Sequence, residues 1–141
     1  MVHHCDDLGC RYWHDFLNLN TMTSLNIIEK FSLFSETWTP KIIGELNGQY
    51  VKLAKVKDEF VWHSHEQEDE LFMIFRGTLH MDFRDRTEVV REGEMIIVPK
   101  GVEHNPRTNG EEVWVLLFEP VETAHTGNIE HERTVHNLKW I

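Results

Sequence analysis

The sequence is poor in basic residues and has no long hydrophobic run. It contains 14 lysines and arginines against 24 aspartates and glutamates, which gives a formal net charge of −10. Nucleic acids and anionic membrane surfaces are bound by clustered basic side chains, so we expect neither as a partner. None of the apolar runs approaches the roughly 20 residues that span a bilayer, and no transmembrane helix is expected.

Cysteine is also scarce, because the chain has two, Cys5 and Cys10. Both lie in residues 1–23, which lack the basic and then apolar pattern of a secretion signal. We therefore expect a cytoplasmic protein with reduced thiols. Together with the two cysteines, three nearby histidines could resemble the ligands of a zinc site: His3, His4 and His14. The spacing of the cysteines is wider than in a zinc knuckle, and a poorly ordered extension is the preferred interpretation.

The length of 141 residues and a hydrophobic content of 40% predict one domain with a real core. We interpret residues 1–23 as an N-terminal extension and residues 24–40 as a short helix with its lead-in. Residues 41–120 are predicted to form a barrel, and residues 121–141 a tail that packs on the barrel or on a second subunit. Because regular patterning begins just after Met22, this methionine is a hypothesis for the natural start.

A short helix is predicted to begin at Ser24, which has the side chain of a good N-cap. Apolar residues follow near helical spacing: Ile27, Ile28, Phe31 and Phe34. After this segment the pattern changes from helical to extended.

Short alternating or apolar segments with frequent turn signals fill the rest of the barrel region. The Asn47-Gly48 pair is a strong hairpin signal, since both residues tolerate a positive φ. The segment from Pro99 to His104 is interpreted as a loop. The predicted strands are 41–46, 50–56, 60–65, 70–77, 78–83, 87–90, 94–99 and 111–118. This count predicts an all-β antiparallel sandwich or barrel.

Two predicted strands, "LFMIF" and "VWVLLF", are apolar on both faces. A sheet with one face in water alternates more clearly, so another element must cover the second face. The N-terminal helix, the C-terminal residues 136–141 and a second subunit are the alternatives. We expect a homodimer.

His63 and His65 alternate within "FVWHSH". Successive side chains of a strand point to opposite faces, so both imidazoles project from one face and can bind one ion. The alternative is a surface strand with two solvated histidines. Trp62, which points to the other face and should be buried, argues against this alternative.

Four carboxylates follow the two histidines. Glu66, Glu68 and Asp69 lie in a polar connection and are interpreted as a solvated, charged rim. Glu70 opens the apolar strand and shares its core face with Phe72. A buried charge without a partner is costly, and a divalent cation would compensate it. Glu70 is therefore the predicted carboxylate ligand.

Two segments resemble the motifs of the cupin family. Residues 63–77 are similar to the first motif, His-x-His, then a glutamate, then a glycine, and residues 93–104 are similar to the second, Gly, Pro-x-Gly, then a histidine. The matching positions are His63, His65, Glu70, Gly77, Gly93, Pro99, Gly101 and His104. The loop before His104 can return that histidine towards a barrel interior. A spacer of 15 residues between Gly77 and Gly93 suits one small module.

This resemblance covers residues 41–119 and extends through the tail to about Thr134, where the sequence looks like small type-2 cupins of mostly unknown reaction that resemble mannose-6-phosphate isomerase. It implies a double-stranded β-helix, or jelly-roll barrel, with a short N-terminal helix. It also implies one divalent transition metal (Fe, Mn, Ni or Zn). The implied ligands are His63, His65, Glu70 and His104.

Three functions are open for such a site. The first is catalysis on a small polar metabolite by a metal-dependent oxygenase, isomerase or lyase. The second is a non-catalytic binding module or sensor for a small molecule, and the third is a structural metal site in an interaction protein. Open coordination positions favour the first over the third, since structural zinc sites are closed.

No catalytic acid or base is assigned. Lys52, Lys55 and Glu103 are possible groups at the rim of a pocket, and each is interpreted as solvated. Four further histidines are interpreted as exposed: His80, His125, His131 and His136.

Overall fold

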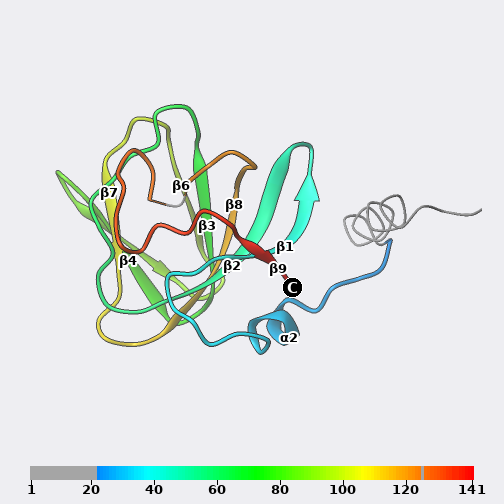
Figure 1. The fold of residues 1–141 in the computed structure, drawn as a ribbon. Coiled ribbons are helices and arrows are strands. Elements are labelled where there is room, and N and C mark those ends of the chain that lie inside the picture. Colours follow the sequence, from blue (N-terminus) through cyan, green and yellow to red (C-terminus); the bar gives the residue numbers. More distant parts are fainter. Residues whose placement is uncertain (1–21, 125) are drawn as a thin grey trace, which may run out of the picture.

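The computed structural model describes residues 22–124 and 126–141. Strands dominate this part of the chain and form two sheets that face each other (Figure 1). The six-stranded sheet has the order β6-β3-β8-β2-β1-β9, and the three-stranded sheet has the order β5-β4-β7. The strands are β1 (Lys41–Leu46), β2 (Gln49–Val56), β3 (Glu70–Arg76), β4 (Thr78–Phe83), β5 (Thr87–Arg91), β6 (Met95–Val98), β7 (His104–Arg107), β8 (Val113–Pro120) and β9 (Lys139–Trp140). The predicted all-β jelly-roll fold is confirmed.

Alternation along the central strands builds the core between the two sheets. In β8, every second residue is buried from Val113 to Glu119, and its partners β2 and β3 are both antiparallel to it. The inward side chains of these strands meet Leu79, Met81 and Val90 from the smaller sheet. Apolar burial of this kind is the main force that holds the two sheets together. The core therefore occupies the inside of the barrel, and the polar ends of its strands are available for a site.

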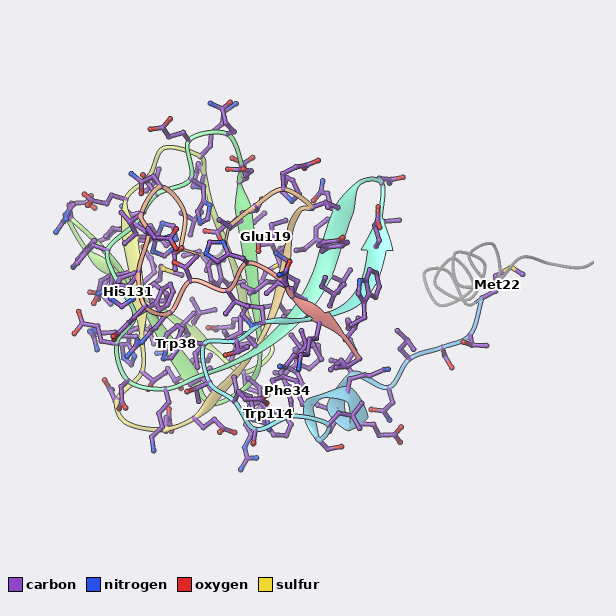
Figure 2. All side chains as sticks on the ribbon, in the orientation of Figure 1. Met22, Phe34, Trp38, Trp114, Glu119 and His131 are labelled. Atoms are coloured by element: carbon purple, nitrogen blue, oxygen red, sulfur yellow. The ribbon has the colours of Figure 1, made fainter. Side chains whose placement is uncertain are left out.

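The outer face of the large sheet is covered by both ends of the described chain. Phe31 stacks on Trp114 with ring centroids 4.8 Å apart, and Phe34 belongs to the same cluster (Figure 2). At the other end, β9 pairs in parallel with β1, and Ile141 joins this cluster. The helix and the C-terminal tail thus cover an apolar face that the sequence left without an assigned partner.

Lys55 contributes to the same contact, and its interpretation as a solvated rim group is wrong. Its side chain is buried because the ammonium group donates a 2.7 Å hydrogen bond to the carbonyl of Phe34. The same group lies 5.1 Å from the ring centroid of Trp114. A lysine can be buried when its charge is satisfied in this way by a carbonyl and aromatic faces.

The helix, α2 (Ile27–Phe31), begins later than predicted. Its N-cap is Asn26, whose side-chain oxygen accepts a hydrogen bond of 3.1 Å from the Glu29 amide, and not Ser24. Both residues are good N-caps, but Asn26 places Phe31 towards the sheet, and this tertiary contact decides the position. Across residues 22–124 and 126–141, no helix has the length and apolar character that crossing a membrane requires.

Two strand predictions are also corrected. Residues 60–65 form no strand, and this segment is held by one isolated bridge between His63 and His104 and by a hydrogen bond from the Phe60 amide to the Pro106 carbonyl. In contrast, the end of the predicted loop continues as β7, which pairs with β4. β7 contains Pro106 and has four residues without a clear apolar alternation, so its sequence carries no strand signal. The predicted Asn47-Gly48 turn is confirmed, with φ values of 52° and 73°.

Candidate metal centre

Four buried side chains meet at one end of the barrel. His63, His65, Glu70 and His104 each offer one ligand atom, and these atoms lie within 4.8 Å of one another. Glu70 is the first residue of β3 and His104 is the first residue of β7. The backbones of His63 and His104 exchange two hydrogen bonds of 3.0 and 2.9 Å, which join the two sequence motifs directly. All four side chains singled out from the sequence are therefore brought together.

Backbone carbonyls orient two of the imidazoles. The Nδ1 atom of His63 lies 2.8 Å from the carbonyl oxygen of Val61, and Nδ1 of His104 lies 2.9 Å from that of Val102. A carbonyl oxygen only accepts hydrogen bonds, so the proton of each neutral imidazole resides on Nδ1. The Nε2 atom of each ring then keeps a free lone pair, which is the arrangement that outer hydrogen bonds impose on metal-binding histidines.

The ligand atoms face one another without satisfying one another. The Oε2 atom of Glu70 lies 2.9 Å from Nε2 of His65 and 3.1 Å from Nε2 of His104. Within the described residues, none of these three buried atoms has a partner in hydrogen-bond geometry. Lone pairs held this close require a cation or a proton between them. Three imidazoles and one carboxylate form a donor set that fits a divalent transition metal.

Burial and mutual charge shift the pKa values of the cluster. Burial is the main reason that the pKa of His63 falls to about 4, and the neighbouring His104 adds to this effect. Burial also raises the pKa of Glu70, but His104 and His65 lower that pKa more, so the net shift is downward. The site therefore favours a neutral His63 and an ionised Glu70, the forms that bind metal.

Comparison with known proteins agrees with this geometry. A family profile described as a cupin domain matches residues 49–118. A solved structure of a cupin-2 domain protein from Shewanella frigidimarina is 46% identical, with a TM-score of 0.67, and the alignment covers 68% of this chain and 93% of that one. This chain belongs to the cupins.

Two further proteins are similar to this chain, and neither description names a function. A solved protein from Neisseria meningitidis is 31% identical with a TM-score of 0.64, and the alignment covers 70% of this chain and 99% of that one. The uncharacterised protein YdbB of Bacillus subtilis is 39% identical over 67 residues. This match covers 47% of the cupin and 59% of YdbB, so the chain spans less than two thirds of that relative's length.

The acidic residues beside the cluster behave largely as predicted. Glu66 and Asp69 are exposed, and Asp69 accepts a 2.8 Å hydrogen bond from the amide of Lys100. Glu68 is half-buried and its carboxylate lies 4.0 Å from Nδ1 of His65. It is thus a neighbour of the site as well as a rim residue. Trp62 is half-buried under the guanidinium group of Arg84, and its predicted full burial is wrong.

Lys52 is fully buried, which corrects its interpretation as a solvated rim group. Its ammonium group lies 2.7 Å from the carboxylate of Glu119, and both side chains are inaccessible to solvent (Figure 2 labels Glu119). Glu103, the third proposed rim group, is exposed and bonds to Arg84. Sequence reasoning missed Glu119. Its signal was the alternation of β8, which places Glu119 on the same inward face as Val113, Val115 and Leu117.

Glu119 lies beside the predicted metal ligand. Leu71 pairs with Phe118, so the adjacent residues Glu70 and Glu119 are neighbours on the inner face of the sheet. The pKa of Glu119 is raised to about 8, mainly by burial and also by the charge of Glu70, and Lys52 only partly offsets this rise. The inner end of the barrel thus holds a row of buried ionisable side chains from Glu70 through Glu119 to Lys52.

The C-terminal segment supports the pair of histidines, although it lies outside the matched family region. Asn128 bonds to both backbone groups of Ser64, which separates His63 from His65. Gly127 packs against the same place with a φ of +60°, and a Cβ atom there would meet the carbonyl of Ser64 and lie 3.1 Å from Cδ2 of His63. His63 and His65, the two candidate ligands, are therefore held by a segment outside the barrel strands.

Gly127→Ala should lower the free energy of unfolding by at least about 1 kcal/mol, because alanine is strained at positive φ and collides with Ser64. It should also speed the release of bound metal, since the His63–His65 segment must move. Gly110→Ala is a matched control, with a φ of +85° and nothing within 4 Å of its Cβ. Urea denaturation and metal release to a chelator measure the two effects. Equal effects from both variants would contradict the packing role of Gly127.

The metal-free protein should lose stability as the pH falls from 6.5 to about 4. Over this range the unfolded chain binds a proton at His63 and the folded protein does not, so acid favours unfolding. Because a pKa difference of one corresponds to about 1.4 kcal/mol, His63 contributes on the order of 3 kcal/mol. Urea denaturation after chelator treatment measures this slope. His63→Gln should flatten it, and an unchanged slope would show that other groups are responsible.

The remaining histidines do not join the cluster. His80 is half-buried, and its exposed assignment is wrong. His131 is also half-buried, whereas His136 is exposed as predicted. His125 and the N-terminal set of Cys5, Cys10 and three histidines lie outside the described residues.

Proposed function

We propose that this cupin binds one divalent transition metal through His63, His65, Glu70 and His104, and that it acts on a small molecule at that ion. One observation carries this proposal: three buried ligand atoms lack hydrogen-bond partners within the described residues and converge on one point. Backbone bonds that fix the imidazole tautomers support it.

The donor set suits Fe, Mn, Ni or Zn, and such an ion would supply Lewis acidity or redox chemistry. Four protein ligands leave up to two positions of an octahedral ion for another molecule. Three neutral imidazoles and one carboxylate neutralise only part of the charge of a divalent ion. The occupied site would therefore retain positive charge and favour an anionic oxygen ligand. This chain's own residues would hold the ion, fix the imidazole tautomers and exclude bulk water.

A non-catalytic binding or sensor role is the second candidate, and one observation favours it. The cavity beside the cluster is lined by His63 and Glu70 and otherwise by apolar residues, so it offers no separate acid or base. A reaction would then depend on the ion and on groups of the substrate. A structural metal site is a third reading, and it predicts a closed, four-coordinate ion.

Elemental analysis tests the metal proposal. The protein should be made without a histidine tag, which would bind metal itself, and without chelators, which would remove a bound ion. We expect about one transition metal ion per chain. A metal-free protein that also fails to bind Fe, Mn, Ni or Zn would overturn the proposal. Oxygen uptake and product analysis over a metabolite panel then separate catalysis from binding alone. The expected homodimer and the expected cytoplasmic location stay predictions.

A further inference from the structure

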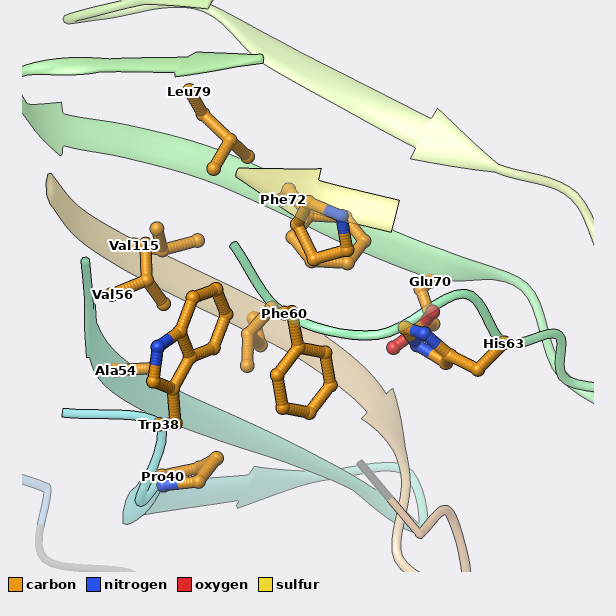
Figure 3. Close-up of a pocket in the computed structure, with 12 residues that line it drawn as sticks. Trp38, Pro40, Ala54, Val56, Phe60, His63, Glu70, Phe72, Leu79 and Val115 are labelled. Carbon is orange, nitrogen blue, oxygen red and sulfur yellow. The ribbon is translucent and has the colours of Figure 1, made fainter. Parts of the chain in front are cut away.

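A small cavity lies inside the barrel directly beside the cluster. The volume of the cavity is about 40 Å³, and His63 and Glu70 form one end of it (Figure 3). Ala54 and Val115 come from the paired strands β2 and β8, and Trp38 and Phe60 close the other side. The cavity is therefore built from elements that are far apart in the sequence.

The polar part of the cavity lining is confined to one end. Its lining residues are apolar apart from His63 and Glu70. The indole nitrogen of Trp38 points elsewhere, since it donates a 2.8 Å hydrogen bond to the carbonyl of Lys57. Away from His63 and Glu70 the walls offer a water molecule no polar partner, and a water needs two or more, so this part of the cavity disfavours water. A molecule that enters must place its polar part at His63 and Glu70 and its apolar part against the other walls.

The size of the cavity limits that apolar part. One water requires about 10–15 Å³ by this measure, and a cavity of about 150 Å³ accepts benzene. The 40 Å³ found here therefore suits a group of about two to four heavy atoms. The walls resist expansion, because Trp38 and Phe60 stack with centroids 4.5 Å apart and Val115 is fully buried in the central strand.

We propose that this cavity is the subsite for a short aliphatic group of about two to four carbons, whose anionic end lies at His63 and Glu70. The ligand class is then a small aliphatic carboxylate or a related oxyanion. The anionic end rests on the proposed metal function, whereas the aliphatic subsite rests on the cavity alone. The proposal narrows the small polar metabolite predicted from the sequence to one with a compact apolar part.

Xenon tests the cavity without reference to the metal. Crystals of the full chain under xenon pressure should show one xenon atom between Ala54, Phe60 and Val115. Ala54→Val adds two methyl groups on a strand that favours valine, and it should remove this xenon site. Val89→Ile is the matched control, because Val89 is 37% exposed on β5 and does not line the cavity. Absence of xenon from the wild-type cavity would overturn the proposal.

A series of carboxylates tests the ligand class on metal-loaded protein, by calorimetry with acetate, propionate, butyrate and hexanoate. Affinity should rise about fourfold for each added methylene up to butyrate, since burial of a methylene contributes about 0.8 kcal/mol, and should fall for hexanoate. Ala54→Val should remove the preference for butyrate over acetate, and Val89→Ile should keep it.

A series without chain-length dependence, or the same preference in Ala54→Val, would overturn the aliphatic subsite while leaving metal binding intact. Metal content is measured on every sample, so the two proposals fail separately. Xenon bound in a protein that takes up no metal would reject the proposed function and its anionic end. Metal bound without a chain-length preference would reject the subsite alone.

Discussion

His104→Ala should weaken metal binding by more than about 100-fold, because loss of an outer hydrogen-bond partner already costs 10- to 100-fold and His104 is a proposed direct ligand. His104 is also the one member of the cluster that comes from the second motif, at the start of β7. Its loss therefore removes an imidazole that lies against the ring of His63, whose backbone pairs with that of residue 104. Metal titration of the chelator-treated protein measures the change.

The control for this experiment is Glu66→Ala. Glu66 belongs to the same acidic stretch, but its side chain is exposed and does not join the cluster. Glu68 is a poorer control, because its carboxylate lies 4.0 Å from His65. Added metal should raise the Tm of the wild type and of Glu66→Ala, since a ligand that binds only the folded state stabilises it. An equal metal affinity in His104→Ala and Glu66→Ala would contradict the assignment.

Lys52→Met should lower the free energy of unfolding by about 3–5 kcal/mol, the usual cost of removing one partner from a buried ion pair. Lys52 and Glu119 are both inaccessible to solvent, and their charged atoms lie 2.7 Å apart. Without Lys52, the carboxylate of Glu119 remains buried next to that of Glu70. Urea denaturation of the metal-free protein at pH 9, above the pKa of about 8 for Glu119, measures the loss.

The pH dependence of this loss identifies its cause. The pKa of Glu119 is already raised to about 8 by burial and by Glu70, and removal of Lys52 raises it further. The folded protein then holds a proton that the unfolded chain releases, so stability falls as the pH rises above the unfolded value near 4.5. The wild type carries the same proton up to a pH of about 8, so the deficit of Lys52→Met should grow only above that pH, where Glu119 ionises beside Lys52 in the wild type and stays protonated in the variant.

A double variant provides the matched comparison. Lys52→Met with Glu119→Leu removes both charges, and it should recover most of the stability that Lys52→Met loses, because buried pairs can often be replaced by apolar residues at little cost. Additive losses in the double variant would mean that the two side chains do not form an energetic pair. If the double variant recovers the stability, its metal affinity then tests whether Lys52 and Glu119 influence the proposed metal site.

Local pattern carried the predictions that the structure supports. The alternation of His63 and His65 needs only an extended backbone, so both project into the site although residues 60–65 form no strand. Glu70 opens an apolar strand, and its burial follows from the same period of two. The resemblance of two ordered motifs to the cupins supplied His104 and the jelly-roll fold.

Features that depend on contacts between distant segments were missed. The strand β7 exists because β4 pairs with it, and not because its own residues favour a strand. Asn128 and Gly127 reach the histidines from a tail whose sequence shows no regular pattern. Lys52 reads as an ordinary surface lysine until the register of β2 and β8 places it beside Glu119.

The sequence by itself determined the fold class and the four residues of the cluster, because side-chain period and motif spacing are local properties of the chain. The tertiary structure alone decided which charges are buried together, what supports the histidines from behind, and how large the apolar cavity is. Those properties depend on strand register and on the packing of segments far apart in the chain, and a shift of one residue in register would change all of them.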